Sequence, residues 1–130
     1  MAAPNRSGLA KATQFHPTSA QIDGGYGTAL VEDFLQWASE HGVRAIGGLP
    51  TGFADLPISD ESLAAIRAIY REHAAEFLEL PNRSRYPREA FFDSADHLNE
   101  PAQIIHSVAV ARGLLRQTAQ VTDRIPARSP

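Results

Sequence analysis

Two carboxylates and an imidazole stand close together between residues 91 and 100, just ahead of an apolar run. Asp93 and Asp96 precede His97 by four residues and by one residue. A histidine acts as a general base when a carboxylate holds one ring nitrogen and the other nitrogen faces the nucleophile. Because adjacent side chains in extended backbone diverge, Asp93 is the better partner. The spacing therefore predicts a contact between Asp93 and His97.

The same residues also have a purely structural interpretation. Asp93 can form a local turn, Asn99 can cap the helix that follows, and His97 can pack under Phe91 and Phe92. Residue types and spacing alone favour this second interpretation, because an aspartate and a histidine are often close in sequence. The predicted helices and strands around these residues are needed to distinguish the catalytic interpretation from the structural one.

Helices and short apolar strands alternate along the chain. Apolar residues recur at helical spacing in three segments, and two short apolar runs, each ended by a proline, have the length of buried strands. Gly42 is placed to end the first helix and Asn99 to cap the last, with Pro101 tolerated in its first turn. The predicted helices span 28–41, 59–73 and 99–115, and the predicted strands span 43–49 and 76–80. We expect the apolar stripes of all three helices to be core faces.

The two ends of the chain show no sustained period. We predict an irregular N-terminal segment at 1–25, with a short strand at 12–15, and a disordered tail at 120–130. Asp23-Gly24-Gly25 indicates a turn, since glycine reaches positive φ at no steric cost. The α/β domain is expected to span 26–119.

This order of elements predicts an α/β fold with three layers, α/β/α, around a short and mostly parallel sheet. Ligands of such sheets bind outside the carboxyl ends of the strands. Segments 49–57 and 81–99 emerge at that edge. The stretch that contains Asp93 and His97 therefore lies where a binding site is expected.

Composition excludes several classes of function. The chain has 130 residues, which fits one domain, and a net charge of -3 without clustered Lys or Arg, which offers no footprint for nucleic acid or an anionic membrane. It lacks cysteine and has no apolar run of the ~20 residues that a membrane span requires. No pair of histidines has the spacing of a metal motif, and Gly24, Gly25 and Gly27 lack the partners of a phosphate-binding loop. We predict no metal and no cofactor.

The predicted loop that precedes residues 91–100 carries two guanidinium groups and a phenol. Arg83, Arg85 and Tyr86 lie at the expected site edge, where they can bind the carboxylate of a sugar acid or a polymer. The alternative is a loop whose charged side chains are simply solvated.

The segment Phe91-Phe92-Asp93-Ser94-Ala95-Asp96-His97-Leu98-Asn99-Glu100 follows a short strand and Tyr86-Pro87, and it precedes a C-terminal helix. In this setting it resembles the last block of the SGNH hydrolase superfamily, in particular the acyltransferase-like branch related to alginate O-acetylation and teichoic acid D-alanylation proteins. Leu49-Pro50-Thr51-Gly52-Phe53 is also similar to that branch. The resemblance covers roughly residues 26–118.

The resemblance implies a partial SGNH/flavodoxin-like fold and a Ser-His-Asp triad whose acid and base are Asp93 and His97. It implies a serine-type esterase or O-acyltransferase that acts on acylated carbohydrate or another cell-envelope polymer, in the periplasm or cell envelope. The family takes its serine from a Gly-Asp-Ser-like turn after the first strand and its oxyanion donors from later Gly and Asn residues. This sequence contains neither of these features.

None of the serines has the strand–turn–helix setting that exposes an activated hydroxyl, and Ser107 lies within a predicted helix. We therefore expect the C-terminal half of such a domain, a fragment or a subunit completed by another chain. The alternative is a noncatalytic binding or scaffolding α/β domain, which could form a homo-oligomer through uncovered sheet surface.

Overall fold

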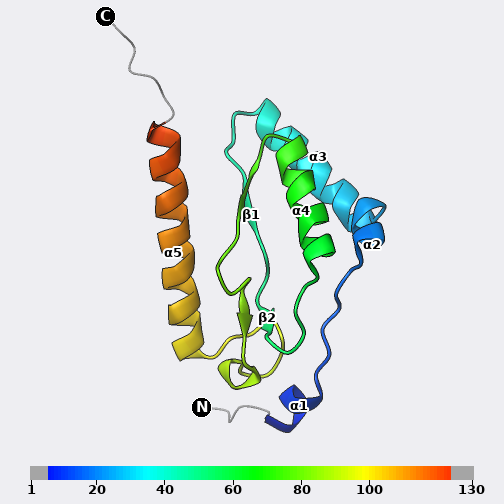
Figure 1. Cartoon of the computed structure of the whole chain (residues 1–130), viewed down its shortest axis with the longest axis vertical. Coiled ribbons are helices and arrows are strands. Elements are labelled where there is room, and N and C mark those ends of the chain that lie inside the picture. Colours follow the sequence, from blue (N-terminus) through cyan, green and yellow to red (C-terminus); the bar gives the residue numbers. More distant parts are fainter. Residues whose placement is uncertain (1–5, 124–130) are drawn as a thin grey trace, which may run out of the picture.

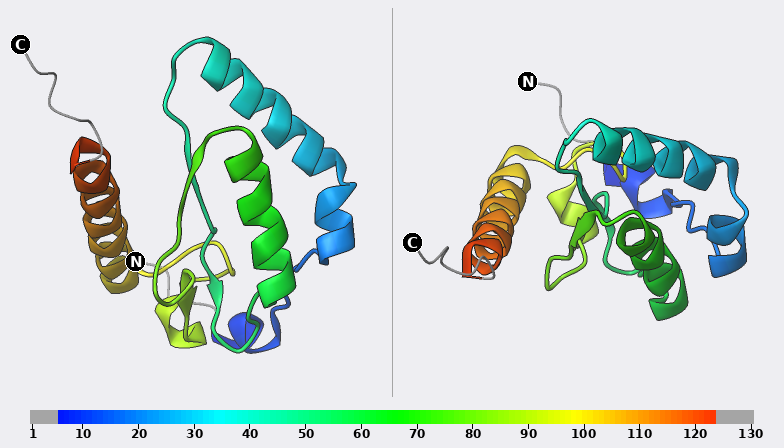
Figure 2. Two further views of the ribbon diagram at one scale, coloured as in Figure 1. Left: turned by 45° about the horizontal axis from the view of Figure 1, so that its top comes forward. Right: turned by 90° about the horizontal axis from the view of Figure 1, so that it is seen from above.

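Three layers make up the protein. In the computed structural model, which describes residues 6–123, α5 (Glu100–Asp123) covers one side of short strands and α4 (Asp60–Glu72) covers the other, with α3 (Tyr26–Glu40) packed beside α4 (Figure 1). The view from above in Figure 2 shows the same order of layers. The predicted α/β architecture is confirmed.

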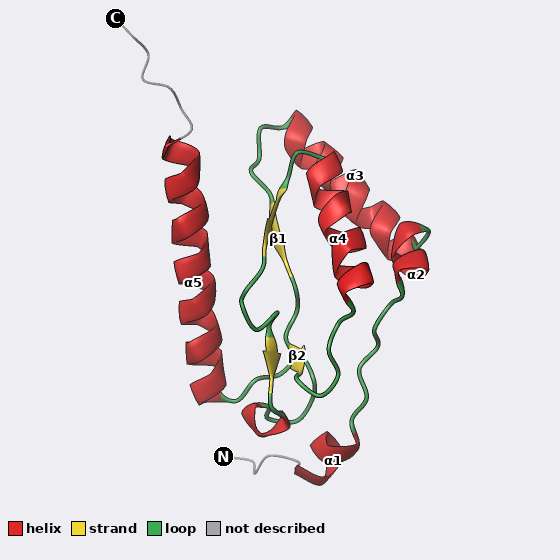
Figure 3. Cartoon of the chain, viewed as in Figure 1, coloured by secondary structure: helices red, strands yellow, loops and turns green. Residues whose placement is uncertain are grey.

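The strands form two successive parallel pairs. β1 (Ile46–Gly48) pairs with β3 (Glu76–Leu78), and β2 (Gly52–Phe53) pairs with β4 (Arg85–Tyr86) (Figure 3). Proline has no N–H to donate to a ladder, and Pro50 and Pro81 separate the two pairs. The predicted strands at 43–49 and 76–80 are therefore correct in place but longer than the observed β1 and β3.

The middle layer is packed on both faces. Phe77 of β3 lies against Tyr70 of α4, with ring centroids 5.2 Å apart, and the Tyr70 ring also fills the space beside Gly47. Leu78 points the opposite way, and a Cβ added at Gly113 of α5 would lie 2.6 Å from Leu78 Cδ1. Successive side chains of a strand point to opposite faces, so β3 holds both helix layers in place.

The helix ends agree with the predicted caps. Gly42 has φ 67°, and the N–H of Val43 donates to the carbonyl oxygen of Ala38 at 2.8 Å. The Ser59 hydroxyl accepts a hydrogen bond from the N–H of Ser62 at 3.1 Å at the start of α4. α5 continues beyond the predicted end at Leu115, through Asp123. The predicted tail is thus helical up to that residue, and the rest of it lies outside the described residues.

The prediction for the N-terminal segment is wrong in two respects. The segment contains two short helices, α1 (Arg6–Lys11) and α2 (Ser19–Asp23), and no strand forms at 12–15. α2 starts with a capping box in which Thr18 and Gln21 each satisfy the other's backbone N–H. In place of a strand, the Gln14 side chain donates to the Thr51 carbonyl oxygen at 3.1 Å and accepts from the Phe53 N–H at 3.3 Å. A side-chain amide thus takes the hydrogen-bonding positions that a neighbouring strand would have used.

A buried hydrophobic cluster joins β2 and β4 to the 91–98 segment and the start of α5. It consists of Leu9, Phe53, Tyr86, Phe91, Leu98 and Ala102. The apolar stripes of α3 and α5 are only partly core faces, which corrects the prediction for these helices. Leu35 and Ala38 are buried, but several large apolar side chains on the same two helices are exposed: Tyr26, Leu30, Phe34, Trp37, Ile104, Ile105, Val108 and Leu115.

Candidate functional site

A short hairpin formed by residues 91–98 carries Asp93 and His97. Phe91 and Leu98 form an antiparallel bridge, and the N–H of Phe92 donates to the His97 carbonyl oxygen at 2.8 Å. The side chains of Phe91 and Leu98 belong to the buried hydrophobic cluster that also contains Phe53 and Tyr86. Because both ends of the hairpin are anchored by apolar burial, the polar residues between them are held at the surface in a defined arrangement.

Asp93 and His97 are in contact. Nδ1 of His97 lies 2.9 Å from Oδ1 of Asp93, and the imidazole ring packs against Phe92 with centroids 5.2 Å apart. The predicted contact is confirmed, and it involves Asp93 as expected from the spacing. A carboxylate only accepts hydrogen bonds, so Nδ1 carries the ring proton and the lone pair of Nε2 is left for another partner. The catalytic role of this pair stays a prediction.

A hollow of about 280 Å³ lies beside His97, between the hairpin, the first turns of α5 and the residue before β2. Its lining residues are Thr51, Asp96, His97, Leu98, Gln103, His106 and Ser107. Segments 49–57 and 81–99 were expected to meet at one edge of the sheet, and the pairing of β2 with β4 brings them together as predicted.

The start of α5 is fixed by Asn99 and Gln103. The Asn99 side chain accepts from the N–H of Ala102 at 3.1 Å and donates to the Glu89 carbonyl oxygen at 2.8 Å. Nε2 of Gln103 donates to the Leu98 carbonyl oxygen at 2.6 Å. These bonds join the helix to Leu98 of the hairpin and to Glu89, which precedes the hairpin, so the residues from α5 and those from the hairpin keep their relative positions around the hollow.

His106 is a residue of the hollow that the sequence did not reveal. Its Nδ1 lies 3.0 Å from the hydroxyl of Tyr86, and the two rings meet edge to face with centroids 5.7 Å apart. Tyr86 was expected on an exposed loop, but it lies on β4 and is 8% exposed. Helical spacing could have indicated the position, because His106 follows the buried Ala102 by one turn.

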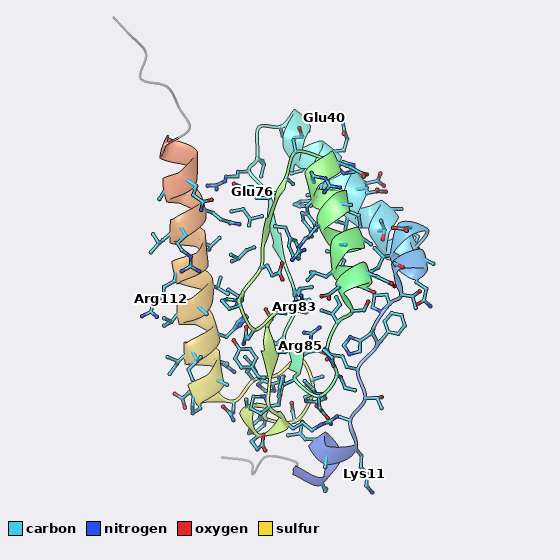
Figure 4. All side chains as sticks on the ribbon, viewed as in Figure 1. Lys11, Glu40, Glu76, Arg83, Arg85 and Arg112 are labelled. Atoms are coloured by element: carbon cyan, nitrogen blue, oxygen red, sulfur yellow. The ribbon has the colours of Figure 1, made fainter. Side chains whose placement is uncertain are left out.

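The structure places Arg83 and Arg85 away from the hollow, on the α4 side of the strands (Figure 4). Arg83 has φ 52°, and its guanidinium pairs with Asp60 at 2.7 Å and Glu79 at 3.4 Å. Arg85 donates to the Pro50 carbonyl oxygen at 3.0 Å, and burial lowers the pKa of its guanidinium. Their predicted role in substrate binding remains a prediction, because the contacts of both side chains are within the fold.

Comparison with protein-family models, with curated proteins and with solved structures finds no match to this chain. Across residues 6–123, no three His, Asp or Glu side chains are grouped so that they could hold a metal ion. In the same part of the chain, every helix is too short or too polar to cross a membrane.

Proposed function

We propose that Asp93 and His97 are the acid and base of a serine-type acyl esterase or O-acyltransferase that acts on esters of carbohydrate or cell-envelope polymers. The observation that carries the proposal is the 2.9 Å contact between Asp93 Oδ1 and His97 Nδ1, beside a hollow lined by the first turns of α5 and by Thr51. Asp93 keeps the lone pair of Nε2 available and stabilises the imidazolium that forms when His97 takes up a proton.

In the proposed reaction, a serine hydroxyl oxygen forms a bond to the carbonyl carbon of the ester while Nε2 of His97 takes up the hydroxyl proton. The tetrahedral species then expels the alcohol, and the imidazolium of His97 returns the proton to the departing oxygen. Water or an acceptor alcohol then attacks the acyl-serine and passes its proton to His97. The bond between the serine oxygen and the acyl carbon breaks, and the imidazolium of His97 returns the proton to the serine oxygen.

The reacting serine is proposed to come from a complementing chain or from further sequence of the same protein. Several serines of this chain have structural contacts: the Ser59 hydroxyl caps α4, the Ser62 hydroxyl donates to the Pro17 carbonyl oxygen at 2.9 Å, and Ser84 is buried. The side chains of Asp93 and His97 are 49% and 52% exposed, which leaves them accessible to a chain that covers the hollow. Such a cover would strengthen their attraction by excluding water.

Ester hydrolysis by the full-length gene product tests the proposal. His97→Ala should lower kcat for a small acetyl ester by about 10²–10⁴-fold, because a general base is lost. His41→Ala is the matched control, since His41 lies at the end of α3, outside the hollow, and this variant should keep full activity. Unchanged turnover in His97→Ala would contradict the proposal.

A serine-reactive fluorophosphonate locates the nucleophile. The 130-residue chain alone should remain unlabelled if the serine comes from elsewhere. Labelling at Ser107, which shares the hollow with His97, would instead place the nucleophile within this chain and remove the need for a complementing one.

The second candidate is a noncatalytic binding or scaffolding domain. It is favoured by the apolar side chains exposed along α3, where Leu30, Phe34 and Trp37 lie at helical spacing and are each about half exposed. Contiguous exposed apolar surface marks an interaction surface. This candidate predicts a mass above that of the monomer by light scattering, together with no effect of His97→Ala on any activity of the full-length product.

A further inference from the structure

Two imidazoles line the hollow, and each has its Nδ1 held by a different kind of partner. His97 comes from the hairpin and is held by the carboxylate of Asp93, whereas His106 comes from α5 and is held by the phenol of Tyr86. The chemistry of the partner decides which ring nitrogen carries the proton. At Nε2, one ring can therefore present a lone pair to a ligand while the other presents an N–H.

The phenol of Tyr86 has one proton to donate. It is buried, and in the described part of the chain the only partner that the structure gives its hydroxyl is Nδ1 of His106. If Nδ1 donated to the phenol oxygen, the phenol proton would have no acceptor in the core, which is a costly arrangement for a buried donor. The hydroxyl therefore donates to Nδ1, and the ring proton of His106 lies on Nε2.

We propose that His106 is a hydrogen-bond donor to the substrate, in the same hollow as the base His97. His97 carries its proton on Nδ1 and offers the lone pair of Nε2, while His106 carries its proton on Nε2 and offers an N–H. One hollow thus combines an acceptor for the proton of a hydroxyl with a donor for a carbonyl oxygen. This pair of opposite tautomers fits the two reacting oxygens of acyl transfer to a hydroxyl group.

The size of the hollow indicates the class of substrate. At about 280 Å³ it is at the lower limit of ligand pockets, which span roughly 300–1,000 Å³. We infer that it takes a small acyl group, such as acetyl, with the rest of the ester outside. The assignment of the carbonyl contact to His106 rests on the proposed function, but its protonation state and its binding of a carboxylate do not.

The test uses the 130-residue chain with nitrogen-15 in its histidines. Long-range proton–nitrogen correlation spectra, recorded at a pH where imidazoles are neutral, identify the nitrogen that carries the proton in each ring. We expect His106 to be protonated on Nε2. In Tyr86→Phe, which keeps the ring but removes the donor, His106 should become a mixture of both tautomers. A proton on Nδ1 in the unmodified chain, or a ring that Tyr86→Phe leaves unchanged, would overturn the proposal.

Acetate is the probe for binding. Titration should shift the amide signals of Leu98 and Gln103, which line the hollow, in a saturable manner. His106→Leu removes the N–H and should weaken acetate binding about three- to tenfold, the effect of one hydrogen bond, while His106→Gln keeps an N–H donor and should retain most of the affinity. Absence of saturable binding, or equal affinity in the three proteins, would overturn the proposal.

Kinetics separate this inference from the proposed function. In the full-length gene product, His106→Leu should lower kcat for an acetyl ester by about 10²-fold with little change in KM, because a donor to the developing oxyanion is lost. If His97→Ala has no effect, the proposed function fails whatever the tautomer of His106. If His97→Ala abolishes turnover and His106→Leu does not reduce it, only the role of His106 fails.

Discussion

The backbone carbonyl oxygen of Gln21 lies against Gly25, in the space that a Cβ would occupy. Gly25 is the residue before the first turn of α3, with φ −80° and ψ 144°, so it does not use the left-handed region that glycine favours. The turn at Asp23-Gly24-Gly25 was predicted correctly, but for a different reason. Gly25 is needed because the α2 backbone approaches it closely, and not because its φ is positive. A glycine is required there because only Gly24 and Gly25 connect α2 to α3, and this short connection brings Gly25 against the Gln21 carbonyl.

Gly25→Ala should destabilise the protein, because the new methyl group would overlap a backbone carbonyl that cannot move without shifting α2. The expected loss in free energy of unfolding is about 1–3 kcal/mol, the usual cost of overpacking. Gly27→Ala is the matched control: nothing lies within 4 Å of its Cβ position. Since Gly27 lies within α3, alanine should stabilise the protein by about 0.5–1 kcal/mol. Denaturant unfolding of both variants checks the two opposite signs, and a loss of equal size in both would contradict this account.

Arg88 joins the N-terminal segment to the core. Its guanidinium lies over the Phe53 ring, with Cζ 4.2 Å from the centroid, and it also donates to Asp55 and to the carbonyl oxygens of Leu9 and Ala12. Arg88→Lys keeps the charge but loses the planar fork, so α1 should separate from the core and trypsin should cleave faster after Lys11.

Asp55→Asn is the comparison for this prediction. It weakens only an ion pair whose carboxylate is 58% exposed, and such pairs contribute about 0–1 kcal/mol. Cleavage after Lys11 should therefore change little in this variant. Equal acceleration in both variants would mean that the ion pair alone holds α1 in place.

The helices and parallel strands could be predicted because their signals are local. Apolar spacing, the Asn99 cap and the prolines that end the strand runs lie within each element. The contact between Asp93 and His97 is local for the same reason. The absence of a strand at 12–15 could not be predicted, because Gln14 satisfies the backbone of residues 51 and 53 from a distant part of the chain. The start of α2 could have been predicted, because its Thr18 and Gln21 capping box is a local signal.

The contact between His106 and Tyr86 was missed for a similar reason. Tyr86 lies twenty residues away from His106 in sequence and was expected on the surface. Only the packing of α5 against the hairpin and strands brings these two side chains together and shows that the imidazole has a fixed partner.

His16 should make the stability of the protein depend on pH. Its Nε2 is buried and has no hydrogen-bond partner among the described residues, and burial, followed by the positive charge of Arg85, lowers the pKa of its imidazole from 6.5. The unfolded chain therefore binds this proton more readily than the folded chain does, so stability falls as the pH drops below 6.5.

His16→Gln removes this titration. Denaturant unfolding at about pH 7.5 and about pH 5 should show a larger loss of stability on acidification in the unmodified protein than in the variant, because only the former has an imidazole whose protonation the folded state disfavours. The same loss in both proteins would assign the pH dependence to other groups.

The central claim is that Asp93 holds the proton of His97 on Nδ1, and nitrogen-15 spectroscopy of the neutral imidazole measures this directly in the 130-residue chain. We predict that His97 is protonated on Nδ1 in the unmodified chain and in Asp96→Asn, and that Asp93→Asn removes this preference. A proton on Nε2 of His97, or a ring that responds equally to both substitutions, would contradict the claim.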